Sequence, residues 1–122
     1  MTRESNILLK KSELFSYRII RMYQYLTAKK GEFVISKQVL RSGTSIGANL
    51  NESRNDQSKA DYLSKQNIAL KEAEETQYWL KNLFGTGYLN EQEYTSINTD
   101  CTELVKMLVA SMNTLKHQLG KL

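Results

Sequence analysis

Two side chains of types that often perform catalysis occur once each, His117 and Cys101. His117 has no acidic residue three or four positions away that would orient its imidazole as a general base. Cys101 occupies an apolar position of a helical repeat, where a thiol packs as a small apolar group. A single cysteine excludes an intramolecular disulfide and a thiolate metal cluster within one chain, and it fits a reducing cytoplasm. We therefore expect a cytoplasmic protein with no enzymatic activity and no cofactor.

Glutamates are further candidates, because helical bundles build di-metal centres from inward glutamates and Glu-x-x-His pairs. The acids that could contribute are Glu52, Glu72, Glu74 and Glu75. The sequence contains no Glu-x-x-His pair, so we expect no metal site. These acids should instead pair with Arg41, Arg54 or Lys71, or lie in solvent.

The glycine-rich segment 43–47 (GTSIG) invites comparison with a phosphate-binding loop. It lacks the Gly-Lys-Ser/Thr ending of such a loop, and no strand precedes it. Gly43, Gly47 and Ala48 instead remove side-chain bulk along a helix, although each glycine costs about 1 kcal/mol of helix propensity. That cost predicts an unusually tight contact with a neighbouring helix.

Positive charge is concentrated in the first third of the chain. The formal net charge is +4, and the sequence pI is about 9.2. Residues 1–41 contain nine lysines or arginines and three acids, a surplus of six positive charges, so the remainder is net −2. A polyanion would meet this part of the chain, and an ordinary solvated basic surface is the alternative. The candidate phosphate-binding residues are Lys10, Arg18, Arg21, Lys29, Lys30 and Lys37.

The elements that position these residues follow from apolar spacing. A helix is predicted from about residue 5 to 29, with the inward residues Leu8, Phe15, Ile19, Met22 and Leu26. Gly31 follows Lys29 and Lys30 and can take the left-handed conformation that ends a helix. A second helix has a partly polar inward stripe of Ile35, Val39, Ser42, Ile46 and Asn49.

Two further helices are predicted after a polar connection at residues 54–57. Ser58 and Asp61 resemble a capping box at the start of the third helix, and Asn90 with Glu93 repeats this pattern at the fourth. The glycines of segment 85–87 end the third helix. Its stripe is Tyr62, Ala69, Ala73, Thr76, Leu80 and Leu83. The stripe of the fourth is Tyr94, Ile97, Cys101, Leu104, Leu108, Ser111 and Leu115.

Four long helices joined by short connections must run up and down. We predict an all-α protein, a single antiparallel up-and-down four-helix bundle formed by residues 1–122. The N-terminus lacks the uninterrupted apolar core of a signal peptide, and no apolar run approaches the roughly 20 residues needed to cross a bilayer. We expect no membrane association.

Ser45, Asn49 and Glu52 share one face of the second helix. Polar groups on or beside an inward stripe need hydrogen-bond partners, and a satisfied polar layer sets which helices pack together and in what register. We favour this structural role, with a ligand site as the alternative.

Several separated motifs resemble one known family. They are segment 41–49 (RSGTSIGAN), Glu52, segment 57–62 (QSKADY), segment 69–72 (ALKE) and segment 75–80 (ETQYWL). Together they resemble the bacterial four-helix-bundle proteins linked to intervening sequences in 23S ribosomal RNA, over nearly the whole chain. Segment 65–68 (KQNI) departs from the more apolar sequence of relatives, which bears on the packing of the third helix.

The resemblance implies a ring-like homopentamer and a relation to the accessory proteins of diversity-generating retroelements, similar bundles thought to bind nucleic acid and a reverse transcriptase. No enzymatic activity attaches to the family. The motif residues expected to form the structural polar layer are Arg41, Ser45, Asn49, Glu52, Lys71, Glu72 and Glu75.

Two functions of different classes are compatible with these observations. The first is a nucleic-acid-binding accessory protein that holds RNA or DNA through phosphate contacts largely indifferent to base sequence. The second is a structural or protein-interaction module, whose interface would use the aromatic residues Tyr17, Tyr23, Tyr25, Tyr78 and Trp79. Basic residues gathered on one exposed face would favour the first function, whereas basic residues dispersed or paired with acids would favour the second.

Overall fold

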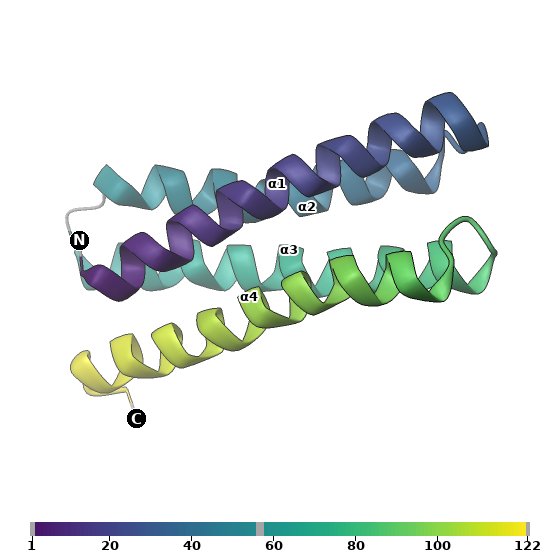
Figure 1. Cartoon of the computed structure of the whole chain (residues 1–122). Coiled ribbons are helices and arrows are strands. Elements are labelled where there is room, and N and C mark those ends of the chain that lie inside the picture. Colours follow the sequence, from purple (N-terminus) through teal and green to yellow (C-terminus); the bar gives the residue numbers. More distant parts are fainter. Residues whose placement is uncertain (1, 56–57, 122) are drawn as a thin grey trace.

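The computed structural model describes residues 2–55 and 58–121, and four long helices account for most of them (Figure 1). They are α1 (Arg3–Lys30), α2 (Ile35–Glu52), α3 (Lys59–Gly85) and α4 (Glu91–Gln118). A short 3-10 helix, η1 (Ser53–Asn55), follows α2. The connection predicted at residues 54–57 therefore begins inside η1, and its residues 56–57 lie outside the described part.

Each helix runs antiparallel to the one before it, and both chain ends lie at the same end of the bundle (Figure 1). Extensive contacts join α1 to α2, α2 to α3, and α3 to α4, whereas α1 and α4 touch over a smaller area. The predicted up-and-down bundle is confirmed. Because α1 and α3 lie on a diagonal of the bundle, with no close backbone approach between their described residues, surface residues of these two helices face different sides of the molecule.

The predicted helix ends are confirmed in detail. Gly31 takes the left-handed conformation with φ 64°, and its N–H donates to Leu26 O. The Asn90 side chain accepts the Glu93 N–H, and the Glu93 carboxylate accepts the Asn90 N–H, so α4 begins with a complete capping box. Ser58 Oγ accepts the Asp61 N–H at 3.1 Å and caps α3, but among the described residues the Asp61 carboxylate makes no return bond to the Ser58 N–H, so only half of this capping box forms.

The start of α2 depends on a residue that the sequence analysis did not identify. The carboxylate of Glu32, which is 6% exposed, accepts the backbone N–H groups of Val34, Ile35 and Ser36. The Ser36 hydroxyl in turn donates to Glu32 O at 2.8 Å. Burial alone would raise the pKa of Glu32, but these backbone hydrogen bonds hold it below its ordinary value. The turn between α1 and α2 is therefore tied to the helix that it precedes.

The core lies along the predicted stripes, with two corrections. All five inward residues predicted for α1 are buried, and so are those of α3 except Tyr62, which is half-buried. In α2 the stripe continues to Leu50, and Ile35 and Asn49 are only half-buried; in α4 Met112 is buried, and Tyr94 and Ser111 are half-buried. At Asn49 and Leu50, and again at Ser111 and Met112, the larger apolar side chain of two adjacent positions occupies the core because its burial removes more apolar surface from water.

The tight contact predicted at the glycines of α2 is confirmed and involves α1. A Cβ at Gly43 would lie 2.8 Å from Ile19 Cγ1, and a Cβ at Gly47 would lie 3.3 Å from the backbone oxygen of Ser12. Side chains at these positions would push the two helices apart. The absence of a Cβ is therefore what allows α1 and α2 to pack this closely.

The atypical segment 65–68 places a glutamine in the core. Gln66 is completely buried, and neither its Nε2 nor its Oε1 has a hydrogen-bond partner among the described residues. Such an amide lowers stability, because its desolvation is not compensated.

No helix in the described ranges is both long enough and apolar enough to cross a membrane.

Candidate nucleic-acid interface

Two of the six predicted phosphate-binding cations take part in ion pairs. Arg18 Nη1 lies 2.7 Å from Asp100 Oδ2, and the same guanidinium donates to the backbone oxygen and the hydroxyl of Ser96. These contacts join α1 to α4. Lys10 Nζ lies 3.7 Å from Glu13 one turn along α1, with both side chains well exposed. Arg18 in particular has a bridging role that its position in the sequence does not reveal.

The other four cations, Arg21, Lys29, Lys30 and Lys37, make no ion pair with any residue in the described ranges. All four are exposed. Lys29 and Lys30 end α1 and Lys37 lies in the first turn of α2, so these three flank the connecting turn. Arg21 lies about two helical turns back along α1. We call residues 29–37 the α1–α2 tip.

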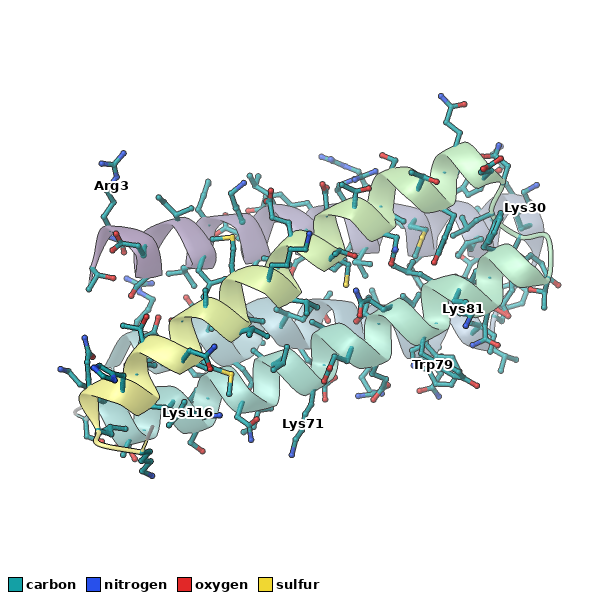
Figure 2. All side chains as sticks on the ribbon, turned by 90° about the horizontal axis from the view of Figure 1, so that it is seen from below. Arg3, Lys30, Lys71, Trp79, Lys81 and Lys116 are labelled. Carbon is teal, nitrogen blue, oxygen red and sulfur yellow. The ribbon has the colours of Figure 1, made fainter. Side chains whose placement is uncertain are left out.

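The α1–α2 tip carries more positive than negative charge. Its one acid, Glu32, is buried and its carboxylate is occupied by backbone N–H groups, whereas Lys29, Lys30 and Lys37 are exposed. Lys81, which the sequence analysis did not select, lies near the same end of the bundle as Lys30 (Figure 2). The exposed acids at this end include Glu91 and Glu93 in the first turn of α4, where they complement that helix dipole.

The α1–α2 tip also presents two exposed apolar side chains. Phe33 is 62% exposed and Val34 is 70% exposed, the two largest values among the large apolar residues of the described chain. They stand between Lys30 and Lys37 on a turn whose backbone is held by Gly31 and Glu32. The tip therefore combines cations with an exposed aromatic group.

The motif residues of α2 and α3 meet along the groove between those helices. Arg41 donates to the carboxylates of Glu72, at 3.4 Å, and Glu75, and Trp79 Nε1 donates to Glu75 at 2.9 Å. Deeper in the same contact, the hydroxyls of Ser42 and Thr76 lie 2.9 Å apart and are buried. This network joins two helices, as expected for a polar layer that sets register.

Among the remaining motif residues, Glu52 joins α2 to α3 and the others do not. Ser45 Oγ donates to Arg41 O, and Asn49 Nδ2 donates to Ser45 O, so both satisfy carbonyls of their own helix. Glu52 pairs with Lys65 at 3.0 Å rather than with Arg54. Lys71 is exposed and makes no ion pair with another described residue (Figure 2).

The aromatic residues considered as interface anchors do not form one patch. Tyr17, Tyr23 and Tyr25 lie on α1, whereas Tyr78 and Trp79 lie on the diagonally opposite α3. Tyr78, 58% exposed, packs edge-on against Trp79 at a ring-centroid distance of 5.1 Å. On α1, Tyr17 donates to the Glu13 carboxylate at 2.6 Å, and Lys30 Nζ lies 5.9 Å above the Tyr25 ring.

The surroundings of Cys101 and His117 in the structure are not those of a nucleophile or a general base. Cys101 is fully buried, and its thiol donates to Ala73 O at 3.4 Å. Burial, with a smaller contribution from Asp100, raises the pKa of this thiol to about 12. His117 is exposed near the end of α4. Within the described residues, no three His, Cys, Asp or Glu side chains are arranged to hold a metal ion.

Comparison with known proteins agrees with the fold and the motifs. Residues 4–110 match the family described as 23S rRNA-intervening sequence protein. A crystal structure of a protein of unknown function from the S23 ribosomal protein family of Bacteroides thetaiotaomicron VPI-5482 superposes with a TM-score of 0.88 at 49% sequence identity, covering 90% of this chain and 98% of that one. Curated proteins returned no match. Since the family match spans most of the chain, this four-helix bundle belongs to the 23S rRNA-intervening sequence protein family.

Proposed function

We propose that this protein is a non-enzymatic accessory factor that binds RNA or DNA through the exposed lysines of the α1–α2 tip. The supporting observation is that Lys29, Lys30 and Lys37 lie at one end of the bundle and make no ion pair with described residues. Lysines in this state can replace the counterions of a phosphate backbone without first breaking an ion pair.

Ion pairs distinguish the six candidate cations from one another. Arg18 and Lys10 already contact Asp100 and Glu13, so we assign phosphate binding mainly to the tip, with Arg21 as a peripheral contact. The family description also refers to 23S rRNA, which makes structured RNA the first ligand to examine. The contacts proposed here are to phosphates and are therefore largely independent of base sequence.

Fluorescence anisotropy with labelled structured RNA and duplex DNA, at two salt concentrations, tests this function. The variant K29E/K30E/K37E should lose most of the binding. The matched control K71E/K106E/K121E changes net charge equally, at exposed lysines outside the tip, and should bind far better. No binding by the unmodified protein at low salt, or equal losses in both triple variants, would contradict the proposal.

We further propose that the bundle assembles into a ring-like homo-oligomer, a pentamer by family resemblance. Exposed apolar groups on α3, notably Ile68, 42% exposed, and Tyr78, support a surface for protein contacts. A ring would bring several weakly basic tips to one ligand and raise its apparent affinity. Light scattering coupled to gel filtration should give about five times the 14.1 kDa chain mass. A monomer at all accessible concentrations would contradict assembly.

A protein-interaction module without a nucleic-acid role is the second candidate. The observation in its favour is the pair formed by Tyr78 and Trp79, because exposed aromatic residues of this kind anchor protein interfaces. Under this function Y78A would impair assembly or partner binding, and the K29E/K30E/K37E variant would have no phenotype in the anisotropy assay.

A further inference from the structure

We infer that Phe33 stacks on an unpaired base, so that the α1–α2 tip recognises single-stranded nucleic acid in preference to a duplex. This inference rests on the proposed nucleic-acid function and specifies the form of its ligand. It follows from the exposure of the Phe33 ring, from the lysines on both sides of that residue, and from the hydrogen bonds that hold the turn.

Phe33 is the most exposed aromatic residue in the described chain, and it makes none of the ring, cation or hydrogen-bond contacts that engage the others. The Tyr17 hydroxyl donates to Glu13, and the Tyr25 ring lies beneath Lys30. Tyr78 packs against Trp79, and Phe84 stacks on Tyr94 with ring centroids 4.6 Å apart. Phe33 has no ring, cation or hydrogen-bond contact of this kind with a described residue and is 62% exposed. Its π-face is therefore available to a planar ligand.

The charges around Phe33 match a nucleotide strand. Lys29 and Lys30 precede the turn and Lys37 follows it, so cations lie on both sides of the aromatic ring along the chain. Proteins that bind single strands combine basic groups, which contact the sugar-phosphate backbone of the nucleic acid, with aromatic side chains on which the bases stack. In a duplex the bases are already stacked on one another, and an exposed aromatic on a protein tip gains little from them.

The turn is rigid enough to present the ring. Gly31 closes α1 in a left-handed conformation, and the buried Glu32 carboxylate binds three consecutive N–H groups that begin at Val34. Phe33 is thus held between two residues with fixed backbone contacts. A ligand that stacks on Phe33 does not have to order this backbone first, which lowers the entropic cost of binding.

Anisotropy titrations with a single-stranded 12-nucleotide RNA and with its 12-base-pair duplex test the inference. The unmodified protein should bind the single strand more tightly. F33A should weaken single-strand binding roughly five- to hundredfold, the range expected for losing one base stack, and should leave duplex binding unchanged. F33Y keeps a stacking ring and should retain the preference. V34A is the matched control, because it trims an exposed apolar side chain of the same turn that carries no ring.

The outcomes separate the inference from the function on which it rests. If the unmodified protein binds neither RNA, the nucleic-acid function itself fails. If it binds but F33A and the unmodified protein have equal single-strand affinity, the stacking role of Phe33 is wrong while the phosphate contacts of the tip still stand. Because Phe33 is largely exposed, F33A should keep the circular dichroism spectrum and melting temperature of the unmodified protein. A variant that loses these is replaced by F33S in the same titrations.

Discussion

Gly43 on α2 lies against Ile19 on α1 so closely that a Cβ on the glycine would come within 2.8 Å of Ile19 Cγ1. Ile19 is completely buried and β-branched, so its side chain has few alternative rotamers. The close approach of α1 and α2 at this point therefore depends on the missing side chain of Gly43. This contact also fixes the position of α1 relative to the helix whose start carries Lys37.

Replacement of Gly43 by alanine should lower the free energy of unfolding by up to about 2 kcal/mol. Overpacking against Ile19 costs about 1–3 kcal/mol, and the better helix propensity of alanine offsets about 1 kcal/mol of it. Gly85→Ala is the control, because a Cβ there meets no atom within 4 Å. Urea denaturation measures both. Equal stabilities of the two variants would show that α1 and α2 can move apart freely.

Glu32→Gln should destabilise the protein by about 1 kcal/mol at pH 7, the usual effect of losing a helix cap. The folded-state pKa of Glu32 lies below its unfolded value of about 4.5. Its contribution is therefore complete above the unfolded pKa and is lost as the pH falls through the folded pKa. Thermal melts from pH 7 to pH 3 should show the difference between the two proteins shrinking below about pH 4.5. A difference that stays constant over this range would contradict the capping role of the ionised carboxylate.

Gln66→Leu should stabilise the protein by about 1–3 kcal/mol, because it removes a buried amide that has no partner among the described residues. The two side chains are similar in size, so packing should change little. Gln24→Leu, an exposed position on α1, should leave stability within about 0.5 kcal/mol. Loss of stability in Gln66→Leu would indicate that the amide is satisfied in solution.

The Cys101 thiol should resist modification in the folded protein. It is fully buried, and its pKa of about 12 leaves very little thiolate at pH 8. Reaction with a disulfide reagent such as Ellman's should be slow in buffer and rapid in 6 M guanidinium. Fast labelling under native conditions would show that α3 and α4 separate readily.

The salt dependence of the binding constant reports how many phosphates the tip neutralises. Each lysine that neutralises a phosphate of a single strand contributes about 0.7 to the slope of log K against log salt concentration. Neutralising Lys29, Lys30 and Lys37 with glutamine should therefore reduce the slope by about 2. The control K71Q/K106Q/K121Q should keep the original slope. A slope that is unchanged by the tip substitutions would place the phosphate contacts elsewhere.

Local signals in the sequence were sufficient for the helices, most of their ends and most of the core. Apolar residues at steps of three and four specify which side of a helix is buried, and Gly31 and the capping box of Asn90 and Glu93 act within a few residues of the chain. The same local logic failed where adjacent positions compete, as for Asn49 and Leu50. There the neighbouring helices decide which side chain faces inward.

The sequence alone determined a basic four-helix bundle and the short contact at Gly43 and Gly47, because periodicity, capping and side-chain size are local properties. Only the tertiary structure decided which cations are available. Arg18 and Lys37 look alike in the sequence, yet α4 brings Asp100 to Arg18, and no described acid reaches Lys37. Likewise, the burial of Glu32 and the solvent exposure of the Phe33 ring became apparent only once the helices were packed. Charge pairing and exposure depend on residues distant in the chain, and only folding brings those together.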